Sequence, residues 1–472
     1  MLRRAMRGIL KWGGISVLSL LLLALTLLGI GLAINARDES LSPQAQSLLI
    51  RPANPYPPED NIYLALAGFD APPGESVTTV GQFRVEEYNH RLAAAQHEPH
   101  WESLYTPLTQ EHPAALQFKG SGEFLQSPRK SYWSDVPPHR AEIVQLLSDN
   151  AELMQRYHDL HRRHGFYETA TPNPLEPIFA PPSNVRTLFL AELVLRMRSA
   201  DARQQHEALA DLEDDLRLWR AVLTGEGTLI SKMLAIAYLH WDELVLADMI
   251  ADRQAPLPDA QANTVAPLFA PEDWNIGRVF FSEFRLQAAM LQQMQFLSEA
   301  APRRPVEGCA GYRWLCSVND QIGTRFFKIN ATENLYAMRA VRLAREAAPG
   351  SMRGHLPDSD EPLVSLRSVY NPFGRMLVGV GAPLYRTYTW RAWDGAAFQR
   401  LVRLGYEIRR QRIAAAAIPA FLQQHAELAT HPGDGRPFLW EAAAGELRVQ
   451  TMAQEHGNRS FSIHVWPAPA GR

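Results

Sequence analysis

The sequence lacks the short motifs that identify many enzymes. The nucleophile turn G-x-S-x-G, the zinc-protease motif H-E-x-x-H and the phosphate loop G-x-x-x-x-G-K-[ST] do not occur in its 472 residues. These absences weaken the case for the familiar hydrolase, metalloprotease and nucleotide-dependent chemistries. We therefore expect no cofactor, and lean towards a protein that is not an enzyme.

Cysteine is scarce, because the chain has only Cys309 and Cys316. A zinc site needs more ligands at shorter spacing, such as C-x-x-C, so we expect no metal there. In an oxidising compartment the two thiols could close a small disulfide ring, which we predict. The alternative is that both thiols are reduced and unrelated.

Lysine is also rare. Five lysines among 47 basic residues leave 42 arginines, a bias typical of GC-rich bacterial genomes. The formal charge is −3, and without the four basic residues that precede residue 12 it is −7. An acidic balance of this kind gives no sign of a nucleic-acid surface.

One long uncharged segment stands out against these absences. Residues 12–35 carry no charge, and 13–34 are about 22 residues, or roughly 33 Å of helix, which is enough to cross a bilayer. The basic residues cluster on its N-terminal side, so we predict a cytoplasmic N-terminus and an outward-facing body. They are Arg3, Arg4, Arg7 and Lys11.

Residues 1–36 are thus predicted to form a cytoplasmic stub and a single anchor in a bacterial inner membrane, with the rest of the chain in the periplasm. The small residues at Gly31 and Ala33 leave open a cleavable signal peptide instead, although such apolar regions usually run 7 to 15 residues.

The remaining chain is predicted to divide into three parts. Residues 37–60 contain five prolines, which favours an extended linker that lifts the body off the membrane. Residues 61–350 show helical periodicity, clearest where Leu212, Leu216 and Trp219 form an apolar stripe among charged residues. We expect an irregular stack of helical hairpins, with a nearly all-apolar central helix over 228–250.

Residues 351–472 change character. We predict a loop-rich stretch over 351–395, a helix over 396–425 and a small antiparallel β meander at the end, where apolar and polar residues alternate. The fold class is therefore mainly α, with one transmembrane helix and a small sheet. Its 46% hydrophobic content suffices for a sizeable core.

Three histidines invite a metal hypothesis, because His158, His161 and His164 repeat every three residues. On a helix the first and last point about 240° apart, so the three cannot converge on one ion. We expect a solvated helix end near Gly165 instead.

Two single ionisable residues stand in apolar surroundings. Lys232 precedes the most apolar helical stretch, and we expect its ammonium group to reach the surface or to pair with Glu226. Glu283 lies among phenylalanines, where burial could raise its pKa for acid catalysis, but an ion pair with Arg278 or Arg285 is the favoured expectation.

Two arginine-rich helix faces are predicted. One carries Arg339, Arg342 and Arg345, and the other carries Arg400, Arg403 and Arg410. Such faces are usually solvated, but guanidinium groups also suit docking to an acidic partner or an anionic envelope polymer.

These patterns favour a membrane-anchored envelope protein that binds or scaffolds other components. The alternative is an envelope hydrolase that acts on cell-wall or lipid-linked substrates through carboxylates such as Glu283.

Overall fold

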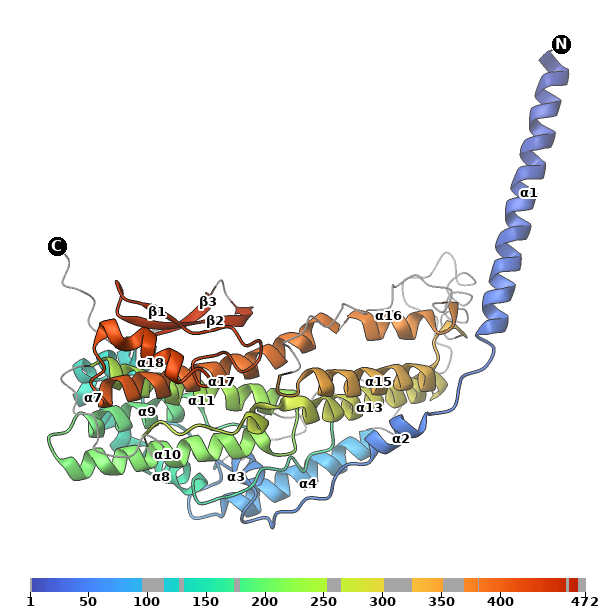
Figure 1. Ribbon diagram of the computed structural model, residues 1–472. Helices are drawn as coiled ribbons and strands as arrows, with labels where there is room; N and C mark the ends of the chain where they lie inside the picture. Colours follow the sequence, from blue (N-terminus) through green and yellow to red (C-terminus); the bar gives the residue numbers. More distant parts are fainter. Residues whose placement is uncertain are drawn as a thin grey trace.

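The structure is a computed structural model that shows a helical body with one long helix projecting from it (Figure 1). It describes residues 2–95, 114–126, 131–173, 179–252, 265–300, 325–350, 369–380, 382–455 and 458–465. Its longer helices are α1 (Leu2–Ile34), α4 (Val77–Ala95), α9 (Ser183–Met197), α10 (Ala202–Thr224), α11 (Leu229–Ala251), α13 (Val279–Ala300), α15 (Ile329–Glu346) and α17 (Ala382–Arg410). The predicted mainly α fold is confirmed.

Shorter elements connect and cover these helices. They are α2 (Pro43–Leu49), α3 (Ile62–Ala67), α5 (Glu123–Gln126), α6 (Tyr132–Asp135), η2 (Pro137–His139), α7 (Arg140–Asp149), α8 (Ala151–Leu160), η3 (Pro271–Trp274), η4 (Ile276–Arg278), α16 (Pro372–Val380), η7 (Ala415–Ala417) and α18 (Ile418–Gln424).

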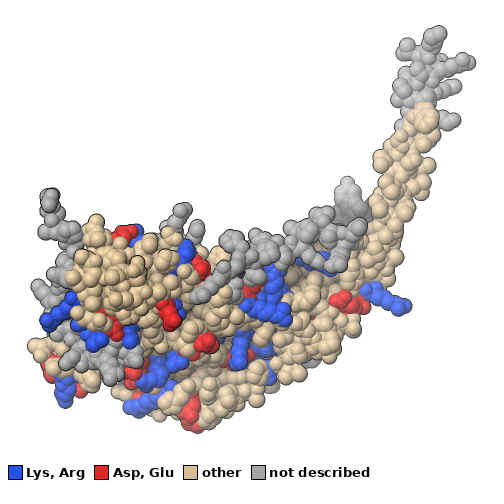
Figure 2. All heavy atoms as spheres, viewed as in Figure 1, with Lys and Arg blue, Asp and Glu red and all other residues tan. Residues whose placement is uncertain are grey.

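Helix α1 carries a segment suited to a bilayer. Within the part of the chain that the structure describes, Gly14–Ile34 is the one stretch of helix long and apolar enough to cross a membrane. It lies almost wholly outside the body, and its visible surface carries no charged side chain between the grey tip and the body (Figure 2). Length and composition alone do not distinguish an anchor from a signal sequence.

The predicted linker does not hang free between α1 and the body. Ser42 caps α2 by accepting from the Ala45 N–H at 3.1 Å, and Ala45 is buried where α2 packs on α13 and α15. Arg51 further along donates a hydrogen bond to the Ala170 carbonyl at 3.0 Å. The expected spacer is therefore corrected: its prolines shape a segment that is bound along the body, because its polar atoms find partners there.

Helices α9, α10 and α11 form the centre of the body. Leu212, Leu216 and Trp219 of the predicted stripe are all buried, and α10 packs against both α9 and α11. Helix α11 is buried along most of its length, as its nearly continuous apolar sequence predicts. The sequence periodicity thus locates the core correctly.

The C-terminal part differs from the prediction. The expected loop-rich stretch contains α16 and the start of α17, while residues 351–368 lie outside the described residues. Helix α17 begins at Ala382 and ends at Arg410, so the predicted 396–425 helix is wrong at both ends. Within the stretch expected to be loop-rich, Pro372 is the first residue of α16, where proline is well tolerated.

The predicted β meander is confirmed. Strands β1 (Leu439–Glu441), β2 (Glu446–Glu455) and β3 (Asn458–His464) pair antiparallel in the order β1-β2-β3. Leu447 faces Ile463 in the register, and both are buried against the helices. Asp394 of α17 fastens the sheet, because it accepts the backbone N–H groups of Met452 at 2.7 Å and Ala453 at 2.9 Å.

Candidate functional site

Ionisable side chains with shifted pKa values gather where helix α11 begins. Glu168 precedes α9, Glu283 belongs to α13, and Ser231 and Lys232 belong to the first turn of α11. Glu168 accepts hydrogen bonds from the Thr228 N–H at 2.8 Å, from the Thr228 hydroxyl at 3.1 Å and from the Ser231 hydroxyl. We call these five residues the α11 cluster.

Two carboxylates cap the same helix. The first N–H groups of a helix lack acceptors within it, and the helix dipole favours negative charge there. Glu168 takes the N–H of Thr228, and Glu283 takes that of Leu229 at 3.1 Å. Burial raises the pKa of both carboxyl groups, although these hydrogen bonds oppose the shift. No sequence pattern indicated Glu168, which lies in an irregular segment.

Lys232 is buried, so the expectation that its ammonium group reaches the surface is wrong. Its ammonium group donates to the carbonyls of Val222 at 2.6 Å and Gly225 at 2.5 Å, at the end of α10. Burial lowers its pKa to about 8, opposed by the charges of Glu168 and Glu226. The lysine therefore joins the end of α10 to the start of α11, which is a structural task.

Glu283 lies in a place too small for a substrate. The cavity beside it, which Tyr336, Arg339 and Tyr385 also line, has a volume of about 10 Å³, barely that of one water molecule. The ion pair expected with Arg285 is not found, because Arg285 pairs with Glu226 instead. Either carboxylate of the α11 cluster can hold a proton, but both accept hydrogen bonds from the N–H groups at the start of the helix.

A second buried group of charges lies between α8 and α11. The Arg186 guanidinium contacts both Asp215 of α10 and Asp242 of α11, and all three side chains are buried. Asp215 also accepts from the Tyr157 hydroxyl at 2.9 Å and contacts His161 Nε2 at 3.0 Å. We call Tyr157, His161, Arg186, Asp215 and Asp242 the Arg186 network.

The two aspartates of this network have opposite pKa shifts. Burial alone raises the pKa of Asp215, but Arg186 and His161 overcome that effect and lower it to about 2. For Asp242, burial dominates and raises its pKa well above the usual range. A sequence signal existed here, since Asp215 follows Leu212 by three residues and precedes Trp219 by four, and so lies on the apolar stripe.

The three histidines do not form a metal site. His161 is in the Arg186 network with a side chain only 6% exposed, His158 lies 3.6 Å from Glu192, and His164 is exposed. The expected solvated helix end is correct for His164. It is wrong for His161, whose side chain contacts the buried Asp215. No group of three or more potential metal ligands occurs among the described residues.

The predicted arginine faces are largely used within the protein. Arg339 donates to the Val378 carbonyl, Arg400 to the carbonyls of Glu427 and Thr430, and Arg403 to that of Ala266 at 2.9 Å. The Arg403 side chain is 13% exposed, which corrects the expectation of a free face on α17.

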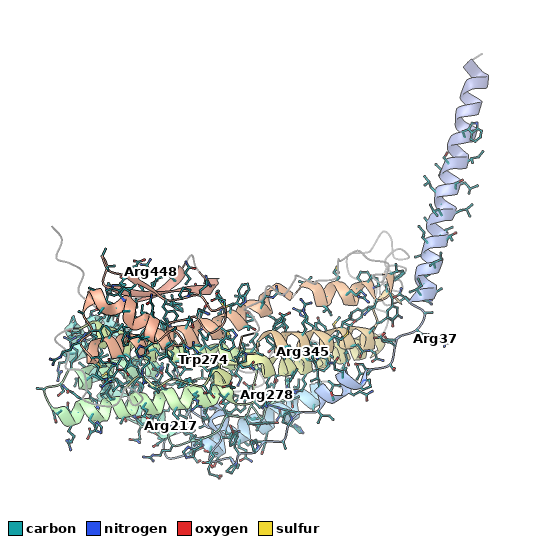
Figure 3. The ribbon with its side chains drawn as sticks, in the orientation of Figure 1. Arg37, Arg217, Trp274, Arg278, Arg345 and Arg448 are labelled. Carbon is teal, nitrogen blue, oxygen red and sulfur yellow. The ribbon has the colours of Figure 1, made fainter. Side chains whose placement is uncertain are left out.

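The rest of the arginine prediction concerns the exposed surface. Arg342 pairs with Glu346, and Arg410 pairs with Glu407. Arg345 is exposed on α15, where Figure 3 labels it. Positive and negative side chains are interspersed over the face seen in Figure 2, rather than gathered by sign.

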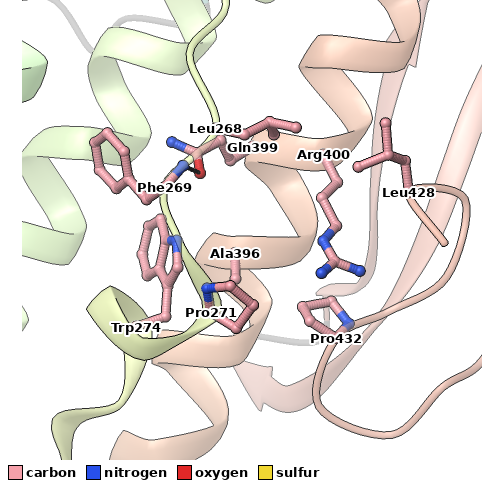
Figure 4. Close-up of a pocket in the computed structure, with 9 residues that line it drawn as sticks. All are labelled: Leu268, Phe269, Pro271, Trp274, Ala396, Gln399, Arg400, Leu428 and Pro432. Atoms are coloured by element: carbon pink, nitrogen blue, oxygen red, sulfur yellow. Dashed lines mark hydrogen bonds between the residues drawn. The ribbon is translucent and has the colours of Figure 1, made fainter. Parts of the chain in front are cut away.

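An apolar pocket of about 200 Å³ lies between η3, α17 and the loop after α18 (Figure 4). Its lining residues are Leu268, Phe269, Pro271, Trp274, Ala396, Gln399, Arg400, Leu428 and Pro432. Gln399 accepts the Phe269 N–H at 2.9 Å, and Arg400 is tied to backbone carbonyls. The pocket is smaller than most ligand sites, which measure about 300 to 1,000 Å³.

The end of α1 is bound to the body by neutral polar groups. Asn35 is 1% exposed and donates to the Val369 carbonyl at 2.7 Å, while it accepts the Asn371 N–H at 2.8 Å. Asn371 in turn accepts the Lys328 N–H at 2.9 Å and donates to the Thr332 hydroxyl at 3.0 Å. We call Asn35, Lys328, Thr332, Val369 and Asn371 the anchor junction.

Further contacts strengthen the anchor junction. Asp38 accepts the N–H groups of Asn330 at 2.9 Å and Ala331 at 3.1 Å, where its charge suits the start of α15. Gly31 is buried, and a Cβ placed on it would lie 3.3 Å from the Phe326 ring. The last turn of α1 is therefore in contact with the folded body.

Cys309 and Cys316 lie outside the described residues, so their disulfide stays a prediction. No protein-family model, curated protein or solved structure matches this chain.

Proposed function

We propose that this chain is a single-pass protein of the bacterial inner membrane that binds or scaffolds other envelope components. In this proposal α1 is an uncleaved anchor with its N-terminus in the cytoplasm, and the body works in the periplasm. The basic residues at the N-terminal end of α1, before its apolar segment, support the orientation, and the rarity of lysine supports the bacterial origin.

The anchor junction is the observation that carries the proposal. Cleavage after Ala33 would remove Gly31, which packs on Phe326, and would leave Asn35 as the second residue of the mature chain. A signal peptide has no need of contacts with the mature fold, whereas a permanent anchor benefits from them. The contact between Gly31 and Phe326, which cleavage would remove, therefore favours retention of α1.

Binding is favoured over catalysis by the state of the ionisable groups. Glu283 and Glu168 cap α11, and Lys232 links two helices, so the side chains with shifted pKa values have structural tasks. The hydrolase alternative needs an open cleft beside Glu283, where the cavity is about 10 Å³. A body held at a membrane by a fixed junction is instead suited to presenting its surface to partners.

The retention of α1 can be tested on the full-length protein carrying a C-terminal tag. We expect the mature protein to keep its N-terminal residues by mass spectrometry, and to stay in the membrane fraction at alkaline pH. A mature chain that begins at residue 34 would overturn the anchor.

The binding role can be tested by crosslinking in cells, followed by mass spectrometry of what co-purifies. A partner in constant ratio to the protein supports the proposal, and a monomer without partners contradicts it.

The arginine hypothesis can be tested in the same experiment. Arg345→Glu reverses an exposed charge on α15, and Arg217→Glu makes the same change on α10, where the side chain is 57% exposed (Figure 3). If Arg345→Glu loses the partner and Arg217→Glu keeps it, α15 is the docking face. If both variants bind the partner as the wild type does, α15 is excluded as the docking face.

A further inference from the structure

Helix α16 exposes a continuous apolar stripe. Phe373, Met376, Leu377 and Val380 follow the spacing of one helix face, and their exposed fractions are 45%, 54%, 42% and 75%. Val369, just before the helix, is 38% exposed. A grouped apolar face of this kind marks a site of interaction, unlike single apolar residues on a surface.

The opposite face of α16 is fixed to the body at both ends. Asn371 caps its start by accepting the Gly374 N–H at 3.2 Å, and Gly374 is buried next to Thr332 of α15. Near its end, the Val378 carbonyl accepts a hydrogen bond from Arg339. The stripe therefore faces outward because backbone groups on the other face of α16 are bound to the body.

The anchor junction sets the position of α16 relative to α1. Asn35 is the first residue after the membrane-length segment Gly14–Ile34, and it is hydrogen-bonded to Asn371. Helix α16 begins at the next residue, Pro372, so it starts at the level where α1 leaves the hydrocarbon. Figure 1 shows α16 running across the direction of α1, on the side of the body towards which α1 projects.

We propose that α16 lies in the membrane interface, with its stripe inserted among the lipids of the leaflet nearest the body. This inference rests on the proposed anchoring of α1. A helix with one apolar face lies in the plane of the interface with that face buried about 5 to 10 Å. The lipid surface is the occupant that the structure favours, because the junction with α1 brings the stripe to the bilayer without any further partner.

The test uses a photoreactive residue in the full-length protein, reconstituted in vesicles of phosphatidylethanolamine and phosphatidylglycerol. p-Benzoylphenylalanine replaces Phe373 or Val380 on the stripe, Leu21 on α1, or Phe83 on α4. Phe83 is the matched control, since it is an exposed phenylalanine, 64% accessible, on a helix at the opposite side of the body from α16 (Figure 1). All four side chains are exposed, so the substitutions leave the packing of the core intact.

After illumination, mass spectrometry identifies what each position has captured. We expect lipid adducts at Leu21, Phe373 and Val380, and none at Phe83. Lipid at Leu21 with none at Phe373 and Val380, or with only a protein captured there, would overturn the interfacial position of α16 while leaving the anchor intact.

The Leu21 position separates this inference from the proposed function. No lipid at Leu21 or on the stripe would overturn both. Lipid on the stripe without lipid at Leu21 would overturn the anchor and support the interfacial helix alone.

Discussion

The anchor junction and the Arg186 network hold helices together in different ways. The network buries an arginine and two aspartates, and one of the aspartates has a pKa lowered to about 2. The anchor junction uses two asparagines, a threonine and backbone groups, of which none carries a charge. Both bury polar side chains, but only the network requires charges to be removed from water.

The difference fits the surroundings of each region. A buried charge is costly unless it is paired, and in the network each aspartate is paired with the arginine. Amide groups satisfy one another at a smaller desolvation cost. Rigid helices surround the paired charges of the network, whereas the buried hydrogen bonds of the anchor junction are neutral and the neighbouring charge of Asp38 lies on the exposed side.

The largest effect is expected from breaking the network on one side. Arg186→Met leaves Asp215 and Asp242 buried without their cation, which should lower the free energy of unfolding by about 3 to 5 kcal/mol. Urea unfolding of the full-length protein in detergent measures this. The exposed Arg345→Met control should change stability by less than about 0.5 kcal/mol.

Replacing Arg186, Asp215 and Asp242 together by apolar residues would sharpen the comparison. We expect the triple variant to be more stable than Arg186→Met, because no charge is left unpaired. A triple variant as unstable as the single one would show that packing, and not charge, is what the network supplies.

The next effect concerns pH. Burial lowers the pKa of His240 to about 4, and its ring packs 4.6 Å from that of Phe398. Its unfolded pKa near 6.5 is higher, so the unfolded chain binds more protons between these values, and stability falls as pH drops from 6.5 to 4. This histidine alone should cost about 3 kcal/mol over that window.

The comparison of wild type with His240→Phe isolates this effect from the carboxyl groups that also titrate. Urea unfolding at pH 7 and pH 4.5 should show a smaller acid-side loss in the variant. An equal loss in both proteins would refute the assignment. The anchor junction, built from amides and hydroxyls, should contribute nothing to the slope.

A smaller effect is expected at the anchor junction. Asn371→Ala removes the acceptor of the Lys328 and Gly374 N–H groups, which should cost about 1 to 3 kcal/mol. Hydrogen exchange should increase at the starts of α15 and α16, and not in α10. Asn371→Gly removes the same side chain without backbone strain, because Asn371 has a φ of 52° that glycine adopts readily. Comparing the two variants separates the loss of the hydrogen bonds from backbone strain.

The smallest effect on folding is expected on the stripe. Met376→Asp changes a side chain that is 54% exposed, so unfolding in detergent should shift by less than about 0.5 kcal/mol. The same substitution should reduce lipid adducts at a photoreactive residue placed at Phe373. A large loss of stability would show that the stripe packs within the protein.

The sequence was sufficient to predict what depends on local periodicity. The apolar run of α1, the stripe of Leu212, Leu216 and Trp219, and the alternation in β2 and β3 each repeat over neighbouring residues, and each gave the correct element. Residues 37–60 were misread because proline indicates an extended backbone but says nothing about what that backbone contacts.

The polar sites were beyond reach for a related reason. Asn35 and Asn371 are 336 positions apart, and Glu168 and Thr228 are 60 apart, so only the folded chain brings them together. Lys232 and Glu283 were singled out, yet Lys232 binds the backbone carbonyls of Val222 and Gly225 and Glu283 accepts the Leu229 N–H, and no side-chain pattern indicates these backbone partners.

Helix α17 has a mechanical consequence. It is 29 residues long, or about 43 Å, and runs from the neighbourhood of α16 to the sheet that Asp394 fastens to it (Figure 1). If α1 tilts in a bilayer as its thickness changes, the anchor junction turns the body with it, and the sheet, at the far end of the lever, moves furthest.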